Sequence, residues 1–188
     1  MKKIFLYSTP ILALSLILCF AFIYPVKGGD KNKKDTIKWY TFSEAVELSK
    51  KNPRKMFIDV YTDWCGWCKK MDAGTFENAA IVKYLNAHYY PVKMNAEMKD
   101  TIIFNNLTFV NPNPTNPRST HQLAASLLSN KLSYPTSVYL DENFGMLQAI
   151  GSYLDAKTLE AVLHFYGEDA NKTTKWDDYF QNFQGEVK

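Results

Sequence analysis

Cysteine is scarce in this chain, and its scarcity excludes a disulfide framework. The 188 residues include three cysteines, and Cys19 lies in an apolar stretch near the amino terminus. Only Cys65 and Cys68 remain for the rest of the chain, so no network of structural disulfides can hold it together. The count does not reveal the compartment, because a single dithiol is read as redox-active even in a cytosolic protein.

Few other side chains could join the two cysteines as metal ligands. The three histidines are scattered along the chain, whereas a zinc site needs two further ligands at metal-ligand spacing. These histidines are His88, His121 and His164. Copper(I) is harder to dismiss, because soft thiolates with Met71 or Met94 could hold it. We predict no metal site, and copper handling stays open as an alternative.

A strong excess of charge is also lacking. The formal net charge is +3, and Lys2, Lys3 and Lys27 supply it, since the remaining basic and acidic residues are equal in number. This balance gives no electrostatic case for binding nucleic acid. With 46% hydrophobic and 22% charged residues, the composition is typical of one globular domain with appendages.

Residues 56–70 carry the chemistry of the sequence. An apolar run at 56–61 predicts a buried strand, and it leads directly into Thr-Asp-Trp-Cys-Gly-Trp-Cys-Lys-Lys. Two cysteines three positions apart at the start of a helix lie on one face, so their sulfurs can bond with little backbone movement. The spacing therefore predicts a dithiol that is oxidised and reduced repeatedly.

Position assigns a different role to each cysteine. A free thiol has a pKa of about 8.5, and a helix N-terminus can lower it to roughly 3.5–7.5. Cys65 lies nearer that end and gains more from the helix dipole, so we predict that it is the nucleophile. Cys68, one turn deeper, would resolve the mixed disulfide by attacking Cys65.

The residues around the dithiol resemble the thioredoxin superfamily. The run Trp-Cys-Gly-Trp-Cys-Lys at 64–69 is most similar to bacterial thioredoxin-like domains that are exported or fused to membrane reductases. Asp59 precedes Cys65 by six residues, as the buried strand aspartate of the family does. The resemblance implies that its carboxylate, with a raised pKa, accepts the Cys68 proton. Lys69 is expected to favour the thiolate modestly.

Ser-Tyr-Pro-Thr at 133–136 resembles the cis-proline loop of the same family. In that family the loop faces the dithiol and pairs its backbone with the substrate chain. The resemblance implies a cis peptide bond at Pro135 and substrate contacts for Tyr134 and Pro135. The residues of the dithiol loop expected to contact substrate are Trp64, Gly66 and an exposed Trp67. Trp67 replaces the proline of thioredoxin itself, so the redox potential is not inherited from the resemblance.

The resemblance covers residues 39–167 and implies an α/β, thioredoxin-like fold with a central mixed sheet flanked by helices. Local patterns predict strands at 37–40, 56–61, 89–94, 138–140 and 146–150. Helices are expected at 65–71, 75–87, 121–130 and 158–165, with another that Ser43 caps and that ends near residue 52.

Two segments depart from a minimal thioredoxin. The asparagine- and proline-rich residues 95–120 form an insertion before the helix that leads to the proline loop, and the insertion is either a substrate-recognition lid or a solvated excursion. A hairpin is expected in its first half. Residues 168–188 are an amphipathic helical tail, predicted to dock on its own domain or in a partner's groove. Its apolar face comprises Trp176, Tyr179, Phe180 and Phe183.

The amino-terminal pattern indicates export. Residues 1–28 are interpreted as a signal peptide or membrane anchor, and residues 29–38 as a polar linker. Residues 4–26 could just span a bilayer as an inner-membrane anchor, and lipidation of Cys19 is a third alternative. The lysines that follow this stretch outnumber Lys2 and Lys3, which conflicts with the positive-inside rule. We still predict a periplasmic or cell-envelope location.

The sequence thus predicts a thiol-disulfide oxidoreductase that acts on protein disulfides in the bacterial cell envelope, as a reductase. It would need no cofactor beyond the Cys65–Cys68 disulfide. Expected partners are protein thiols and disulfides and a membrane-embedded electron donor, with no nucleic acid. The membrane is contacted only through residues 4–26 if they stay uncleaved. The alternatives are a disulfide oxidase or isomerase and, in another class, a dithiol metal-binding or copper-delivery protein.

Overall fold

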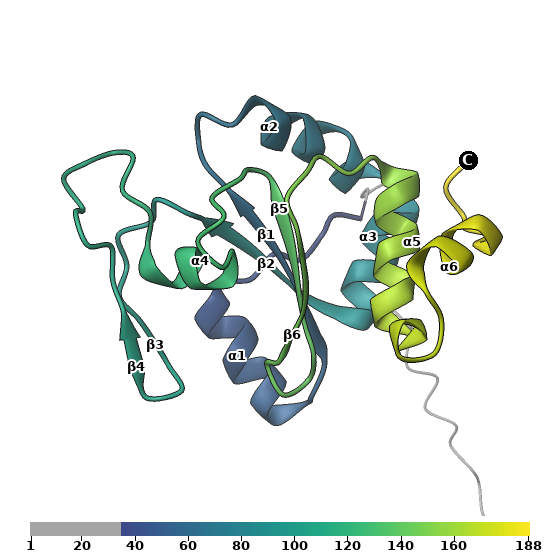
Figure 1. Cartoon of the computed structure of the whole chain (residues 1–188), viewed down its shortest axis with the longest axis horizontal. Coiled ribbons are helices and arrows are strands. Elements are labelled where there is room, and N and C mark those ends of the chain that lie inside the picture. The colour runs from purple at the N-terminus through teal and green to yellow at the C-terminus, as the bar shows by residue number, and fades with distance from the viewer. Residues whose placement is uncertain (1–34) are drawn as a thin grey trace, which may run out of the picture. The chain divides into compact units, whose positions relative to one another are not determined.

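A four-stranded mixed sheet lies at the centre of the fold. The computed structural model describes residues 35–188, and its sheet has the strand order β2–β1–β5–β6 (Figure 1). Strand β1 runs parallel to β2 and antiparallel to β5, and β6 runs antiparallel to β5. The bounds are β1 Lys55–Tyr61, β2 Tyr89–Asn95, β5 Thr136–Leu140 and β6 Met146–Ile150. The predicted mixed sheet is therefore confirmed.

Helices cover both faces of this sheet. Helices α1 (Phe42–Lys51) and α4 (Gln122–Leu127) pack with one apolar cluster, and α2 (Gly66–Ala73), α3 (Ala79–His88) and α5 (Ala156–Gly167) pack with the other. Successive residues of β1 alternate between the two clusters. A strand buried on both faces is apolar almost throughout, which explains the continuous apolar run of β1.

The starts of two helices differ from the prediction. The N-cap of α1 is Thr41 rather than Ser43, because Thr41 and Glu44 form a capping box in which each side chain accepts from the other's backbone N–H. The helix expected over 75–87 is divided into the 3₁₀ turn η1 (Thr75–Glu77) and α3. The division occurs at Asn78, whose side chain caps α3.

The segment before α1 is not the strand that the pattern predicts. Its pairing with the sheet is one isolated bridge between Tyr40 and Val92. Ile37, assigned to a polar linker, is buried against the sheet layer that contains α2, α3 and α5. Ile37 thus adds apolar surface to that layer, as burial of an apolar side chain favours.

The insertion contains the hairpin that its apolar residues predict. Strands β3 (Ile102–Phe104) and β4 (Leu107–Phe109) pair antiparallel, and Asn105 and Asn106 form the turn with positive φ angles of 50° and 61°. Asparagine tolerates this left-handed region and suits such tight turns. Phe104 packs edge-on against Phe42, with ring centroids 5.2 Å apart, and so anchors the hairpin to α1.

The carboxyl-terminal tail docks on α5, as predicted. Helix α6 (Trp176–Asn182) places Trp176 and Tyr179 against Phe165, with ring centroids 5.3 Å and 5.0 Å apart. The chain beyond α6 is held by the buried carboxylate of Glu160 on α5. This carboxylate accepts the backbone N–H groups of Glu186 (2.6 Å) and Val187 (3.0 Å). Aromatic packing and a buried carboxylate thus fasten the tail at two places.

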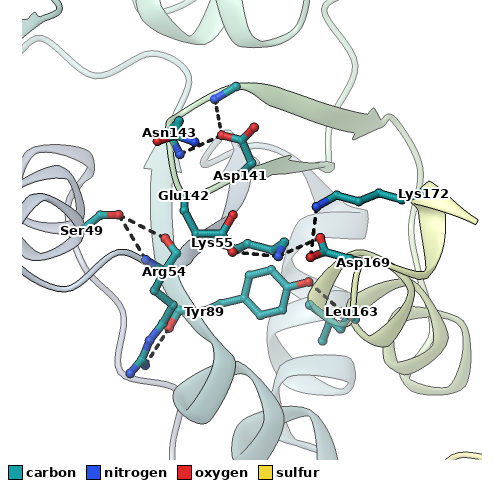
Figure 2. A network of polar contacts seen from close by, with 11 residues as sticks. Ser49, Arg54, Lys55, Tyr89, Asp141, Glu142, Asn143, Leu163, Asp169 and Lys172 are labelled. Carbon is teal, nitrogen blue, oxygen red and sulfur yellow. Dashed lines mark hydrogen bonds and ion pairs between the residues drawn. The ribbon is translucent and has the colours of Figure 1, made fainter.

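A buried lysine connects three distant segments at one end of the sheet (Figure 2). The Lys55 ammonium at the start of β1 lies 2.8 Å from Glu142 Oε1 in the β5–β6 turn and 3.0 Å from Asp169 Oδ1 beyond α5. Burial lowers the pKa of Lys55, but its hydrogen bonds to the two carboxylates outweigh that effect and raise the pKa above its ordinary value. The network fixes the end of the sheet that lies away from α2.

Candidate functional site

A disulfide joins Cys65 and Cys68 at the start of α2, with Cα atoms 5.3 Å apart. Cys65 is the N-cap residue, and its sulfur accepts a hydrogen bond from the Cys68 backbone N–H at 3.0 Å. The helix therefore begins at Gly66, one residue later than expected, because the first cysteine occupies the cap. Cys65 is 5% exposed and Cys68 is 2% exposed, so neither thiol belongs to the open surface.

Asp59 lies on the face of β1 that is turned towards α2. Strand alternation places it on the same face as Phe57, which packs in one cluster with Met71 of α2. Its side chain is 1% exposed, which excludes a solvated carboxylate at the rim of the sheet. The parallel register sets Asp59 beside Lys93 of β2, and the Lys93 ammonium donates to Asp59 Oδ2 at 2.6 Å.

Lys93 also donates to the carboxylate of Asp72 on α2. One ammonium therefore joins the helix that carries the dithiol to the strand that carries Asp59. Sequence reasoning missed both residues. Their signals were available: Lys93 interrupts the apolar strand expected at 89–94, and Asp72 follows Cys68 by four residues, about one helical turn.

Burial raises the pKa of the Asp59 carboxyl above its ordinary value. The loss of hydration outweighs the opposing attraction of Lys93, and the negative charge of Asp72 raises the pKa further. The predicted direction of this shift is confirmed. Within residues 35–188, Oδ1 of Asp59 has no hydrogen-bond partner, whereas Oδ2 is occupied by Lys93.

The proline loop, residues 133–136, leads directly into the strand that pairs with β1 at Asp59. The Tyr134–Pro135 peptide bond is cis, as predicted, and Pro135 is buried. Strand β5 follows at once, and its Ser137 pairs with Asp59 of β1. Tyr134 meets the ring of Trp64 edge-on, with centroids 5.8 Å apart. The fold therefore brings the proline loop and the dithiol loop together from positions that are about 70 residues apart in the chain.

Two tryptophans of the dithiol loop are exposed: Trp64 precedes Cys65, and Trp67 lies between the two cysteines. Trp64 is 50% exposed and Trp67 is 57% exposed, so the expectation of an exposed Trp67 is confirmed. Trp67 packs beside Tyr153, and the Lys70 ammonium lies 4.7 Å from the Trp67 ring centroid. The indole N–H of Trp64 donates to Glu97 Oε1 at 2.8 Å. The dithiol loop thus presents two exposed aromatic side chains.

The remaining predicted residues lie on the exposed start of α2. Gly66 has open space where a Cβ would be, and Lys69 is exposed. The structure therefore joins α2, which carries both cysteines, to Asp59 through Lys93, and it joins the dithiol loop to the proline loop through Trp64 and Tyr134. Gly66, Trp67 and Lys69 are exposed. Among residues 35–188, no group of three or more histidine, cysteine or acidic side chains could hold a metal ion.

The segments predicted as signal peptide or anchor lie outside the described residues. Residues 35–188 include no helix that is both long enough and apolar enough to cross a bilayer.

One protein family accounts for most of the sequence. The family model Thioredox_DsbH, described as "Protein of unknown function, DUF255", matches residues 30–175. The chain belongs to this family. Membership in the thioredoxin superfamily, expected from the residues around the dithiol, is therefore confirmed.

Solved structures with the same architecture support the fold assignment. A DsbH oxidoreductase superposes with a TM-score of 0.50 at 18% identity, covering 80% of this chain and 95% of that one. A thioredoxin from Thermus thermophilus gives 0.53 at 15% identity, covering 70% and 87%. A thioredoxin-fold protein from Helicobacter pylori gives 0.52 at 16%, covering 69% and 84%. At these identities the likeness establishes the thioredoxin-like fold alone.

Sequence relatives match only part of this chain. An uncharacterized protein of Caenorhabditis elegans is 30% identical over 73 residues, which are 38% of this chain and 10% of that protein. An uncharacterized protein of Archaeoglobus fulgidus is 29% identical over 72 residues, which are 38% of this chain and 55% of that protein. Mouse spermatogenesis-associated protein 20 is 29% identical over 75 residues, 39% of this chain and 10% of its own length. The matched stretches thus span a tenth to about half of these relatives.

Proposed function

We propose that the protein is a thiol-disulfide oxidoreductase that reduces protein disulfides in the bacterial cell envelope. The observation that carries the proposal is a disulfide at the start of α2, the helix that Asp72 and Lys93 join to the buried carboxylate of Asp59. Membership in the Thioredox_DsbH family and the cis-proline loop support the same chemistry.

The reaction begins from the reduced dithiol. The Cys65 thiolate attacks one sulfur of the substrate disulfide, the substrate S–S bond breaks, and the first substrate thiolate leaves and takes up a proton. Cys65 is then joined to the substrate through a mixed disulfide. The N-terminal end of α2, where Cys65 is the cap residue, favours the negative charge on this sulfur.

Cys68 completes the exchange. Its thiol gives its proton to Asp59, whose Oδ1 is the oxygen left open by the Lys93 ion pair. The Cys68 thiolate attacks Cys65, the mixed disulfide breaks, and the second substrate thiol is released. Two electrons have then moved from the protein to the substrate, and the protein carries the Cys65–Cys68 disulfide.

The reductive direction requires an electron supply. We assign this role to a membrane-embedded dithiol donor, in line with the similarity of the dithiol loop to the domains of membrane-linked interchange proteins. The exposed Trp67 is a further candidate contact for such partners. The dithiol itself carries the electrons, so the proposal needs no separate cofactor.

The reduction potential of Cys65–Cys68 tests the direction. The full chain is equilibrated in glutathione or dithiothreitol buffers, and the free thiols are trapped and counted. We expect a potential below roughly −230 mV, which suits a reductase. A potential of about −120 mV would instead identify a disulfide donor and overturn the proposed direction. The two values are well separated, since a difference of 30 mV already corresponds to about 1.4 kcal/mol.

Location is tested separately. A reporter enzyme that is active only after export, fused behind residue 38, should be active in bacteria, and it should be inactive when residues 1–28 are deleted. Fractionation then shows whether the fusion stays with the membrane, as an anchor requires, or is released. Activity that does not depend on residues 1–28 would contradict the proposed export.

The metal-binding alternative has its own measurement. Reduced protein is titrated with copper(I) and zinc(II) in the presence of a competing chelator. Tight stoichiometric binding together with no turnover of a protein disulfide would reject the enzyme in favour of a dithiol metal carrier.

A further inference from the structure

The half-exposed Trp64 is held in place from three directions. Glu97 Oε1 accepts its indole N–H at the ring edge, and Tyr134 packs edge-on against it. The third neighbour is Arg118, whose guanidinium carbon lies 4.2 Å from the ring centroid. Such a side chain is a rigid platform next to Cys65, because its rotation would break all three contacts.

Arg118 presents unused hydrogen-bond donors at this platform. It is exposed, and within residues 35–188 its guanidinium makes no ion pair and no hydrogen bond. A guanidinium lying over an aromatic ring keeps its N–H donors in its own plane, where they fit a carboxylate in a bidentate arrangement. Its position over Trp64 therefore leaves Arg118 ready to bind an anion beside the nucleophile.

The insertion that supplies Arg118 is braced at its base. Buried Asn111 donates to the carbonyls of Met98 (3.1 Å) and Ser119 (2.8 Å), which lie at opposite ends of the loop. Buried His121 accepts from the Leu123 N–H through Nδ1, and its Nε2 bonds to the Asp100 carbonyl at 2.9 Å. These bonds, made by buried side chains, fix the base of the arm formed by residues 98–119, whose residues 112–118 are exposed.

We propose that this arm is a substrate-recognition element and that Arg118 selects substrate segments with an acidic side chain next to the reactive cysteine. The inference rests on the proposed disulfide exchange and adds the substrate class. A segment lying along the proline loop with its sulfur at Cys65 passes Trp64, and its neighbouring carboxylate would then meet Arg118. Arg118 is thus a specificity-determining residue contributed by the insertion.

Opposing charges near the platform do not remove this preference. Glu97 lies at the edge of the Trp64 indole, whereas Arg118 lies over its face. Asp63, the residue before Trp64, is exposed. Both carboxylates repel an acidic segment at longer range. The bidentate contact with Arg118 is short and directional, so it dominates where the substrate carboxylate touches the arm.

The test uses reduced full-length protein and a pair of matched disulfide-bonded peptides. One peptide carries glutamate on both sides of its cysteine, and the other carries glutamine at those positions. Acid-quenched thiol trapping at low salt measures the second-order rate of exchange in a single turnover. The variants are Arg118→Gln and Arg118→Glu, with Lys70→Gln as matched control, because Lys70 lies over Trp67 on the other flank.

We expect the wild-type protein to react about tenfold faster with the glutamate peptide, the ratio that a charge-assisted contact gives. Arg118→Gln should abolish this preference, and Arg118→Glu should reverse it. Lys70→Gln should retain it. The preference should shrink as salt is added.

Different outcomes of this experiment would overturn the role of Arg118 and the proposed function. Exchange without a charge preference, or a preference that survives in Arg118→Gln, would overturn the role of Arg118 and leave the proposed function intact. No exchange of the wild-type protein with either peptide would overturn the proposed function and this inference with it. Circular dichroism of each variant shows whether it has folded, and Arg118→Glu provides a second variant at the same exposed position.

Discussion

At the scale of single residues, Asp59 has two oxygens in different environments. Oδ2 is paired with Lys93, while Oδ1 has no partner among residues 35–188. Burial holds the pKa of this carboxyl above its ordinary value although a cation lies 2.6 Å away. A carboxyl of this kind exchanges a proton nearer to neutral pH than a solvated one does, which suits an acceptor for the Cys68 proton.

The raised pKa predicts how stability depends on pH. Because the folded state disfavours the ionised Asp59, its stability falls as the pH rises above about 4 and through the folded pKa. Asp59→Asn cannot ionise and lacks this loss. Urea unfolding from pH 4.5 to 8 should therefore show the variant gaining stability relative to the wild-type protein as the pH rises. A relative gain that shrinks with pH would mean that Lys93 dominates and lowers the pKa.

Substitutions of Lys93 and Asp72 should shift the pKa of Asp59, the proposed proton acceptor, in opposite directions. Lys93→Met removes the cation that lowers the pKa of Asp59, so the rising limb of the rate of mixed-disulfide release should move to higher pH. Asp72→Asn removes a charge that raises this pKa, so the limb should move to lower pH. Stopped-flow release rates over pH give both profiles. Equal profiles for the two variants would exclude a role for Asp59 in the release step.

At the scale of elements, the cap of α2 is the residue that we propose as the nucleophile. The Cys65 sulfur accepts the Cys68 N–H, so the proposed exchange would occur at an atom that also caps the start of the helix. The helix is fastened at its other side by the contact between Asp72 and Lys93. The start of α2 and the attachment of α2 to β2 therefore both depend on residues within four positions of the dithiol.

Two substitutions separate the cap from the disulfide. Cys65→Ser and Cys65→Ala both lack the disulfide, but serine retains a side-chain acceptor for the helix N-terminus. We expect Cys65→Ser to be more stable than Cys65→Ala by about 1 kcal/mol in urea unfolding. Equal stabilities would show that the cap at this position contributes nothing beyond the covalent bond.

At the scale of the whole molecule, buried charges connect segments that are far apart in sequence. Lys55 joins the start of β1 to Glu142 and Asp169, and Glu160 holds the tail through two backbone N–H groups. The Lys55 network lies at the end of the sheet away from α2, and Glu160 lies on α5, where the tail returns (Figure 1). The two groups thus fasten different parts of the fold.

Gly185 permits the tail to approach Glu160 closely. A Cβ at this position would lie 2.0 Å from Glu160 Oε2, so Gly185→Ala must displace the carboxylate or the tail. We expect a free energy of unfolding lower by roughly 1–3 kcal/mol and faster proteolytic cleavage between residues 168 and 175. Gly66→Ala is the matched control, since nothing lies within 4 Å of its Cβ position. Equal cleavage of the two variants would contradict the proposed attachment.

The local sequence determined the features that depend on short-range pattern. The apolar run of β1, the dithiol turn, the hairpin at 102–109 and the amphipathic face of the tail were all predictable, because each is set by neighbours within a few residues. The resemblance around Cys65 and Pro135 added the fold and the cis peptide bond. Cap positions were less secure, since Thr41 and Ser43 are equally good caps and only the Glu44 contact distinguishes them.

Only the tertiary structure decided which distant polar groups meet. The parallel register of β1 and β2 pairs Asp59 with Lys93, and helix packing brings Asp72 to the same ammonium. The fold of the insertion sets Arg118 on Trp64, although 54 positions separate them in the chain. Charge and hydrogen bonding act over a few ångströms in space. The sequence therefore identified the dithiol, and the three-dimensional arrangement identified the distant groups that we propose to act with it.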